Sequence, residues 1–164
     1  MYESLEDIDR SREAMRRRIK ALNAQHCSTA RELQAILLEQ AKLGKGLMRA
    51  DVMRSLLRCF GNLIKNTPHD TGRLRAGWQI SENSAELEWK PDVGEYNEFK
   101  NNIAAAIEQK TQDLSLTNAD TIYIFNNVEY LLALDAGWSK RQAGNFIGLF
   151  LQELKAELQG LANK

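Results

Sequence analysis

The stretch from residue 119 to residue 154 constrains the fold more than any other part of the sequence. Residues 121–125 are almost wholly β-branched or aromatic, which favours a strand buried on both faces. The pair Asn126-Asn127 predicts a turn that ends this strand, because an asparagine side chain bonds nearby backbone groups. Residues 130–134 are too apolar for a surface loop, so we expect a short helix or a bent strand under a sheet.

A long amphipathic helix is predicted to close this stretch. Gly137 allows a tight turn, and Ser139 can cap the helix that follows. From Lys140 onward, apolar side chains recur at steps of three and four residues. These apolar positions are Ala143, Phe146, Ile147, Phe150, Leu154, Leu158 and Leu161. We expect this helix to pack across the sheet of an α+β domain.

The amino-terminal part is predicted to be helical. Residues 2–24 carry a narrow apolar stripe that Arg12 interrupts, and residues 23–28 indicate a break before a second helix that Thr29 can cap. The stripe consists of Leu5, Ile8, Met15, Ile19 and Leu22. A narrow stripe suits a helix that lies on one neighbour, either in its own domain or in another subunit. We therefore divide the chain into a helical extension or arm, residues 1–42, and a core domain, residues 43–164.

The core domain is predicted to begin with a helix from about Met48 to Asn66, which Pro68 prevents from continuing. A loop at residues 90–98 and a helix at residues 101–109 should lead back to the central strand. The expected fold is thus α+β, with a small antiparallel or mixed sheet packed by a long central helix and a C-terminal helix.

Alternating side chains predict a β-hairpin between these parts. Residues 73–80 and 84–89 each alternate apolar and polar side chains, which is the period of a strand. Two adjacent antiparallel strands would place their charged side chains on one sheet face. Those side chains are Arg73, Arg75, Glu86 and Glu88.

The charge of the chain is balanced, with 22 Lys and Arg against 22 Asp and Glu. This balance argues against a protein dedicated to tight nucleic-acid binding. The charges are segregated, however: residues 10–20 carry six basic side chains and one acid, and residues 82–98 carry six acids and one lysine. Such segregation suits docking on copies of the same chain or on partners of opposite charge.

No pattern in the sequence predicts catalysis, a metal or a cofactor. His26 and His69 are too far apart in sequence to indicate a metal site, and they fit surface or capping roles. The Asp70-Thr71-Gly72 triplet is explained as a turn. Other candidates also have ordinary explanations: Glu129 and Asp135 as solvated or paired carboxylates, Cys27 and Cys59 as free thiols, and Trp78, Trp89 and Trp138 as core or interface anchors. No apolar run is long enough for a membrane span, and we expect no enzyme activity because no nucleophile, base and orienting group stand together.

Two segments resemble one known family. Residues 70–78, which read DTGRLRAGW, resemble the DTGxLRxxW signature of the tail-completion or minor tail component family of long-tailed bacteriophages. Residues 120–139, with their strand, asparagine pair and Gly-Trp-Ser turn, are similar to the second conserved segment of the same family. The spacing between the segments also fits, and the resemblance covers roughly residues 48–158. The chain departs from the family at Glu129, where members often carry proline.

The resemblance implies a structural virion protein of the phage neck. Such proteins form a ring at the head–tail junction, and a tail of sixfold symmetry implies six copies that meet through heterologous contacts. The implied partners are other copies of the chain, the head-side connector or stopper, and the tail terminator or tube. DNA would pass through without sequence-specific contact, and the protein would be found in the virion and, during assembly, in the host cytoplasm.

We expect the contacts of such a subunit at a defined set of side chains. For the interface with other subunits or partners, they are Arg16, Arg17, Arg18, Arg73, Arg75, Trp78, Asn126, Asn127, Tyr130 and Trp138. Glu86 and Glu88 are expected to face the channel, and residues 1–24 are expected to dock on a neighbouring protein. Two alternatives remain open: a tail-terminator ring that caps the tail tube, and a nucleic-acid-binding regulator that uses the arginine-rich first helix.

Overall fold

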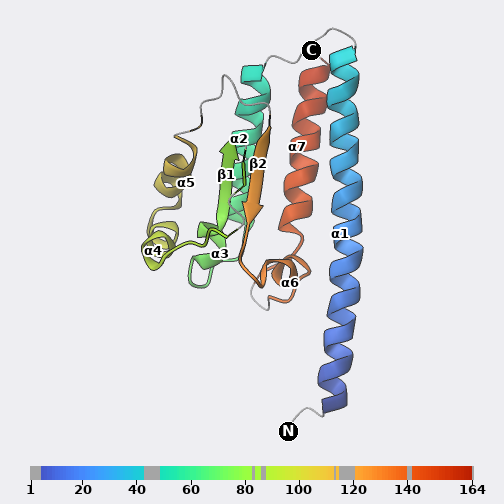
Figure 1. Cartoon of the computed structure of the whole chain (residues 1–164), viewed down its shortest axis with the longest axis vertical. Helices are drawn as coiled ribbons and strands as arrows, with labels where there is room; N and C mark the ends of the chain where they lie inside the picture. The colour runs from blue at the N-terminus through green and yellow to red at the C-terminus, as the bar shows by residue number, and fades with distance from the viewer. Residues whose placement is uncertain are drawn as a thin grey trace.

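The structure is a computed structural model that describes residues 5–42, 49–82, 84–85, 88–112, 114, 121–139 and 142–163. Its elements, in order, are α1 (Leu5–Lys42), α2 (Arg49–Asn66), α3 (Arg73–Ala76), β1 (Trp78–Glu82), α4 (Val93–Asn101), α5 (Ile103–Thr111), β2 (Ile122–Asn126), α6 (Leu131–Asp135) and α7 (Phe146–Ala162). The expected α+β class is confirmed, with a small antiparallel sheet, a long N-terminal helix and a C-terminal helix (Figure 1).

The sheet joins two distant parts of the chain. Strand β1 pairs with β2 in antiparallel register, so that Trp78 lies opposite Asn126 and Glu82 lies opposite Ile122. The predicted hairpin between residues 73–80 and 84–89 is therefore wrong. Residues 73–76 form the short helix α3, and no strand includes the described residues of 84–89; Glu86 lies outside the described part. In the observed register Ile80 lies opposite Ile124 of β2, and both pack in the core.

Helix α7 lies between α1 and α2 and contacts both (Figure 1). The predicted apolar stripe of this helix is confirmed at the buried residues Phe146, Phe150 and Leu158. Two helices, rather than the sheet alone, cover the stripe, because α7 contacts α1 and α2 most extensively. The helix begins at Phe146 and not at Lys140, so Ser139 does not cap it; the Ser139 hydroxyl instead accepts from the backbone N–H of Gln142 at 3.2 Å.

Helix α1 is continuous, so the predicted break at residues 23–28 is wrong. Asn23, Ser28 and their neighbours are weak helix formers, but packing overrides this preference. Leu22, His26, Thr29 and Leu33 keep steps of three and four residues and are at least partly buried, which places one side of the helix against α7. Thr29 does not begin a helix; its hydroxyl donates to the carbonyl of Gln25 at 3.2 Å.

Helices α4 and α5 lie beside β1, on the side of the sheet away from α1 (Figure 1). The predicted helix at residues 101–109 corresponds to α5. The predicted loop at residues 90–98 is wrong, because α4 begins at Val93. Its start has a capping box in which Asp92 and Glu95 each accept the other's backbone N–H at 3.0 Å. The buried Phe99 then fixes α4 to the core.

Candidate functional site

The first segment of the resemblance begins where α2 ends. Thr67 closes α2, because its hydroxyl donates to the carbonyl of Leu63 at 2.7 Å. The indole N–H of Trp78 donates to the same hydroxyl at 2.9 Å. The guanidinium of Arg75 donates to the carbonyls of Thr67 and Lys65 at 3.0 and 2.8 Å. Both side chains therefore satisfy groups at the C-terminal end of a helix, where carbonyls lack helical partners.

This arrangement gives Arg75 and Trp78 roles inside the subunit. Their exposed fractions are 9% and 5%, and burial lowers the pKa of Arg75. Neither offers the surface that an interface contact needs in the free chain. Their burial does not support the prediction that they touch a partner. The alternation of residues 73–80 had placed Trp78 on the apolar side, which agrees with its burial.

Gly72 sets the direction of the turn that precedes α3. Its φ of +89° lies in the left-handed region that favours glycine. A Cβ at this position would also collide with the carbonyl oxygen of Tyr96 in α4. Gly72 is thus required twice, by its backbone conformation and by the close approach of α4, and the prediction of a turn at residues 70–72 is confirmed.

The asparagine pair joins the second segment to the first. The amide of Asn126 donates to the carbonyl of Leu74 at 2.9 Å and accepts from the N–H of Val128 at 3.0 Å. The amide of Asn127 donates to the carbonyl of Trp89 at 3.0 Å. Both side chains are used within the chain to hold the loop between β2 and α6. Their predicted role as contacts with a partner is not tested by these bonds.

A charged cluster links the two segments at the surface. One guanidinium nitrogen of Arg73 lies 3.1 Å from a carboxylate oxygen of Glu129, and the guanidinium carbon lies 5.7 Å from the ring centre of Tyr130. Lys90 Nζ donates to the second oxygen of Glu129 at 2.8 Å. This hydrogen bond, with help from the backbone and from Arg73, lowers the pKa of Glu129 to about 2.

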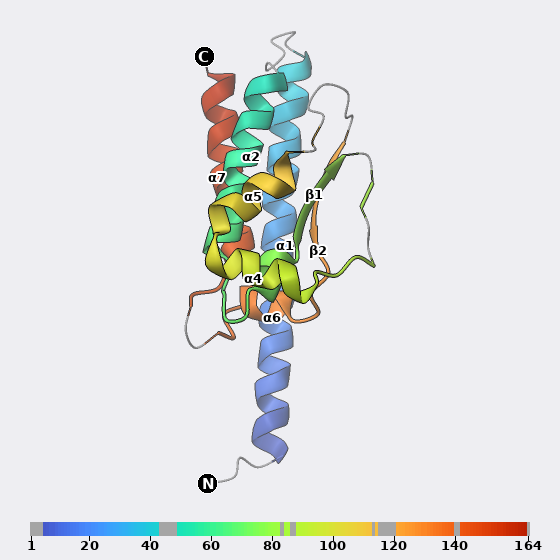
Figure 2. The same cartoon turned by 90° about the vertical axis from the view of Figure 1, so that its left-hand side faces the viewer.

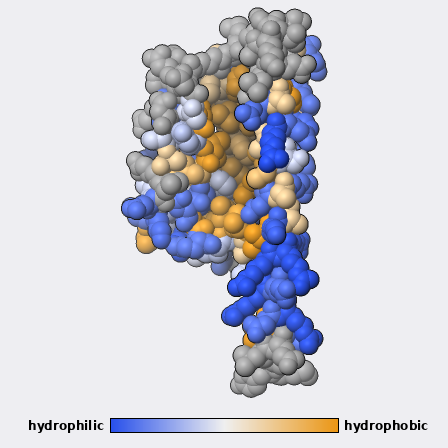
Figure 3. Space-filling view, turned by 45° about the vertical axis from the view of Figure 1, so that its right-hand side comes forward, coloured by the Kyte–Doolittle hydropathy of each residue, from blue (hydrophilic) through white to orange (hydrophobic). Residues whose placement is uncertain are grey.

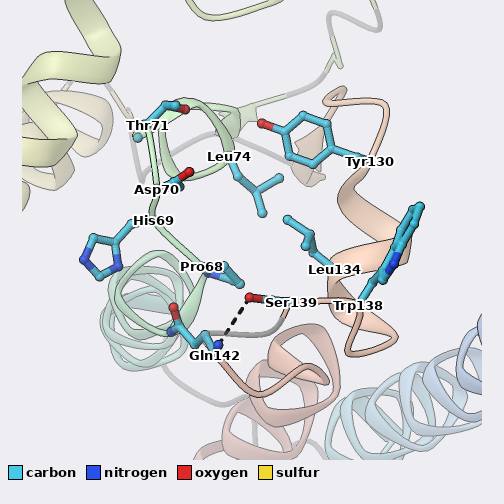
Figure 4. Close-up of a pocket in the computed structure, with 11 residues that line it drawn as sticks. Pro68, His69, Asp70, Thr71, Leu74, Tyr130, Leu134, Trp138, Ser139 and Gln142 are labelled. Atoms are coloured by element: carbon cyan, nitrogen blue, oxygen red, sulfur yellow. Dashed lines mark hydrogen bonds between the residues drawn. The ribbon is translucent and has the colours of Figure 1, made fainter. Parts of the chain in front are cut away.

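The two segments together enclose a pocket of about 670 Å³ (Figure 4). Leu74 from the first segment and Leu134 from the second point into it, as the close-up shows. It is lined by Pro68, His69, Asp70, Thr71, Gly72, Leu74, Tyr130, Leu134, Trp138, Ser139 and Gln142. Apolar side chains form most of its inner surface, with polar groups of the turns around them, which is the composition of a site that receives an apolar group.

The rim of this pocket exposes large apolar side chains. Trp138 is 67% exposed, and Tyr130 and the nearby Leu132 are 37% and 41% exposed. Trp138 follows Gly137, whose φ of +88° turns the chain outward. An exposed tryptophan beside an apolar hollow is typical of an anchor for protein recognition.

Next to the pocket residue Leu134, Asp135 belongs to a buried pair that the sequence did not predict. Nε2 of His26 lies 2.8 Å from Oδ2 of Asp135, and the two residues are 9% and 2% exposed. The other oxygen of Asp135 accepts from the N–H of Ile147 at 3.0 Å. Asp135 therefore ties α6 to the start of α7 and to α1. The expected surface or capping role of His26 is wrong; its place four residues after Leu22, on the apolar stripe of α1, was the signal for burial.

The remaining predicted side chains do not line the pocket. Arg16, Arg17 and Arg18 are exposed on α1, where Arg17 pairs with Glu13 at 2.6 Å. Glu88 is exposed in a turn. The structure thus brings Arg73, Tyr130 and Trp138 to one surface. Of the three arginines of α1, Arg18 comes close to it, because its guanidinium would be 3.1 Å from a Cβ placed on Gly137.

Other chemistry is limited in the residues that the structure describes. Within them, no three side chains of His, Cys, Asp or Glu gather as a metal site requires, and no helix is long and apolar enough to cross a membrane. Cys27 and Cys59 are free thiols, and burial raises the pKa of Cys59 to about 11, so this thiol is held in its unreactive protonated form.

Comparison of the chain with models of protein families, with curated proteins and with solved structures found no match.

Proposed function

We propose that this chain is a structural subunit of a bacteriophage neck, where about six copies form a closed ring that completes the tail and joins it to the head. The observation that carries the proposal is the meeting of residues 70–78 and 120–139, the two segments of the resemblance. They are far apart in sequence and yet enclose one pocket with an exposed tryptophan at its rim.

The polar contacts of these segments support a role that depends on shape. Arg75 and Asn126 satisfy backbone carbonyls, and Asp135 satisfies a backbone N–H, so each fixes a turn around the pocket. Bonds of this kind hold a surface in one conformation before a partner arrives, which reduces the entropy lost on binding. The rim side chains Tyr130 and Trp138 belong to the residue types that dominate binding energy in interfaces.

In this proposal the pocket and its rim receive an apolar side chain of an adjacent neck protein. The partners are the head-side connector or stopper on one side and the tail terminator or tube on the other. No catalytic step, cofactor or metal takes part, and DNA passes through the ring without sequence-specific contact.

The test is a phage in which the gene for this chain is deleted. We expect its lysate to contain filled heads and separate tails that lack this ring, and purified chain to join them when it is added. The variant Trp138→Asp should fold but fail to join them, while the control Ala14→Asp, on the exposed side of α1, should join them as the wild type does. Normal particles from the deletion phage would contradict the proposal.

The acidic stretch from residue 82 to residue 98 suggests which surface borders the channel. A channel for DNA should avoid strong basic patches, because these would bind the phosphates. Reversing the charges of Glu86 and Glu88 to lysine should therefore slow DNA ejection. Unchanged ejection and infectivity would remove this part of the proposal.

The tail-terminator alternative differs from the proposal only in where the chain is located. A terminator would be found on the end of tails that have not yet joined a head. The regulator alternative draws on the exposed Arg16 and Arg17. It requires binding to short duplex DNA that weakens steeply as salt is raised, which a gel shift would reveal.

A further inference from the structure

The amino-terminal end of α1 extends past the rest of the molecule (Figures 1 and 2). Helix α1 has 38 residues, whereas α7, on which it packs, has 17. Arg18 still lies beside the domain, because its guanidinium would be 3.1 Å from a Cβ placed on Gly137. Residues 5–17 continue beyond this level. From here on, the arm means these residues alone and not the whole predicted extension.

The arm repeats the packing pattern of the rest of α1. The side of α1 that faces the domain runs through Ile19, Leu22, His26, Thr29 and Leu33 at steps of three and four residues, and Met15, Arg12 and Ile8 continue these steps into the arm. Most other positions of the arm are charged and exposed. A helix of this length is marginal in water without tertiary contacts, so its apolar stripe is stabilised only by a partner.

A complementary surface lies on the same molecule. The space-filling view shows an apolar hollow on the face beside α1 (Figure 3), and α7 lies between the sheet and α1 (Figure 1). Strand β2 pairs only with β1 among the described strands, so its other edge is open on this side. Several apolar side chains of β2 and α7 pack against the core and stay partly buried: Ile122, Ile124, Ile147, Leu151 and Leu154. We call this hollow the groove.

We propose that the arm of one copy docks in the groove of a second copy, with its apolar stripe against β2 and α7. The occupant is a second copy because arm and groove are present once in each chain, and because the continuous α1 carries each arm away from its own groove. Since the two surfaces differ, the contact is head-to-tail and can close into a ring. The inference rests on the proposed function in one respect: each requires that copies of the chain associate with one another.

The charges of the two surfaces support this pairing. Residues 10–20, at the arm, hold six basic side chains and one acid, whereas an acidic side chain, Glu82, stands at the end of β1 beside the groove. Opposite charges on the donor and acceptor surfaces attract a second copy, while two arms meeting each other would repel.

Arg12 and Glu82 supply a specific pair within this contact. Arg12 stands in the arm's stripe between Ile8 and Met15, so it enters the groove with them. Glu82 is opposite Ile122 in the sheet register, and opposite residues share a sheet face. Oε1 of Glu82 is buried and has no hydrogen-bond partner among the described residues. The guanidinium of Arg12, whose own contact with Asp9 is exposed and 3.9 Å long, would satisfy this oxygen and fix the register of the arm.

The first test is sedimentation velocity of the full chain at low salt over a range of concentrations. We expect the wild type to associate, and Met15→Asp to raise the dissociation constant at least about tenfold, because the stripe then carries a charge into an apolar groove. The matched control is Ala14→Asp, which adds the same charge on the exposed side of the arm. A monomeric wild type, or equal association of the wild type and Met15→Asp, would overturn the inference.

The second test exchanges charges. Arg12→Glu and Glu82→Arg should each associate at least about tenfold more weakly, because each places like charges together. An equimolar mixture of the two variants should associate as the wild type does, since every contact then joins opposite charges. Wild-type association of Glu82→Arg alone would exclude the groove as the docking site. If that variant does not fold, Glu82→Gln keeps the shape, and undiminished association of it would have the same meaning.

These measurements do not depend on any phage. A chain that assembles through its arm but is absent from the neck retains this inference and loses the proposed function. A chain that joins heads to tails although Met15→Asp assembles normally retains the proposed function and loses this inference.

Discussion

The pocket end of the molecule and the arm of α1 are built on opposite principles. At the pocket end, polar side chains bind groups of the chain itself: Arg75 and Asn126 hold carbonyls, and Asp135 holds a histidine and a backbone N–H. On the arm, charged side chains are exposed, and their ion pairs are local ones such as Arg17 with Glu13. A surface fixed in advance suits recognition of one partner, whereas an exposed helix with an apolar stripe suits assembly. The two regions should therefore respond differently to substitution.

Asp135→Ala should have the largest effect on stability. It removes an acceptor from the Ile147 N–H and from His26, and both groups stay buried, so we expect a loss of about 3 kcal/mol in the free energy of unfolding. Urea denaturation measures it. The matched control is Asp9→Ala on the exposed arm, which should change stability by less than about 0.5 kcal/mol. Equal losses of stability from the two substitutions would contradict the claim that buried polar contacts stabilise the pocket end and not the arm.

Gly72→Ala should have the next largest effect. The new Cβ meets the carbonyl of Tyr96 and strains a φ of +89°, so we expect a loss of about 2 kcal/mol. Gly160→Ala in α7 serves as the control, because nothing lies within 4 Å of its added Cβ. This control should be neutral or slightly stabilising, since alanine favours a helix. A harmless Gly72→Ala in thermal unfolding would show that the turn is not constrained as described.

Trp138→Ala should separate stability from recognition at the pocket. The side chain is 67% exposed, so the free energy of unfolding should change by less than about 0.5 kcal/mol. Joining of heads to tails should nevertheless fall at least tenfold, by analogy with exposed tryptophans that dominate interfaces. Full joining activity by this variant would move the docking surface away from the pocket rim.

The pH dependence due to Glu129 should be the smallest effect. Its folded pKa of about 2 is below the ordinary 4.5, so its contribution to stability is fully present above pH 4.5 and is lost as the pH falls towards 2. Glu129→Gln should therefore show a slightly flatter fall in melting temperature than the wild type over this window. Identical curves would mean that the contacts with Lys90 and Arg73 do not persist in solution.

The elements that sequence could predict are those held by local periodicity. Helix α2 and the apolar stripe of α7 follow from spacing alone, and α4 could have been found from Asp92 and Glu95, which form its capping box. The pairing of β1 with β2 could not be found in this way, because a strand pattern does not say which distant strand it meets. The continuous α1 likewise depends on α7, whose packing outweighs the weak helix formers near Asn23.

The candidate site was only partly predictable for the same reason. The turn at Gly72 follows from residue type. The burial of Arg75 and the His26–Asp135 pair depend on where the end of α2 and the side of α1 come to lie, and no local pattern states this. Polar side chains are expected at the surface until a structure shows the backbone groups that they satisfy.

The most direct test of the proposed function is to locate the chain in an assembled particle. Virions that carry an epitope-tagged copy of the chain can be labelled with gold and viewed by electron microscopy. Labels confined to the head–tail junction are the expected result. Particles of normal shape that lack the chain, or labels spread along the tail or over the head, would contradict the assignment to the neck.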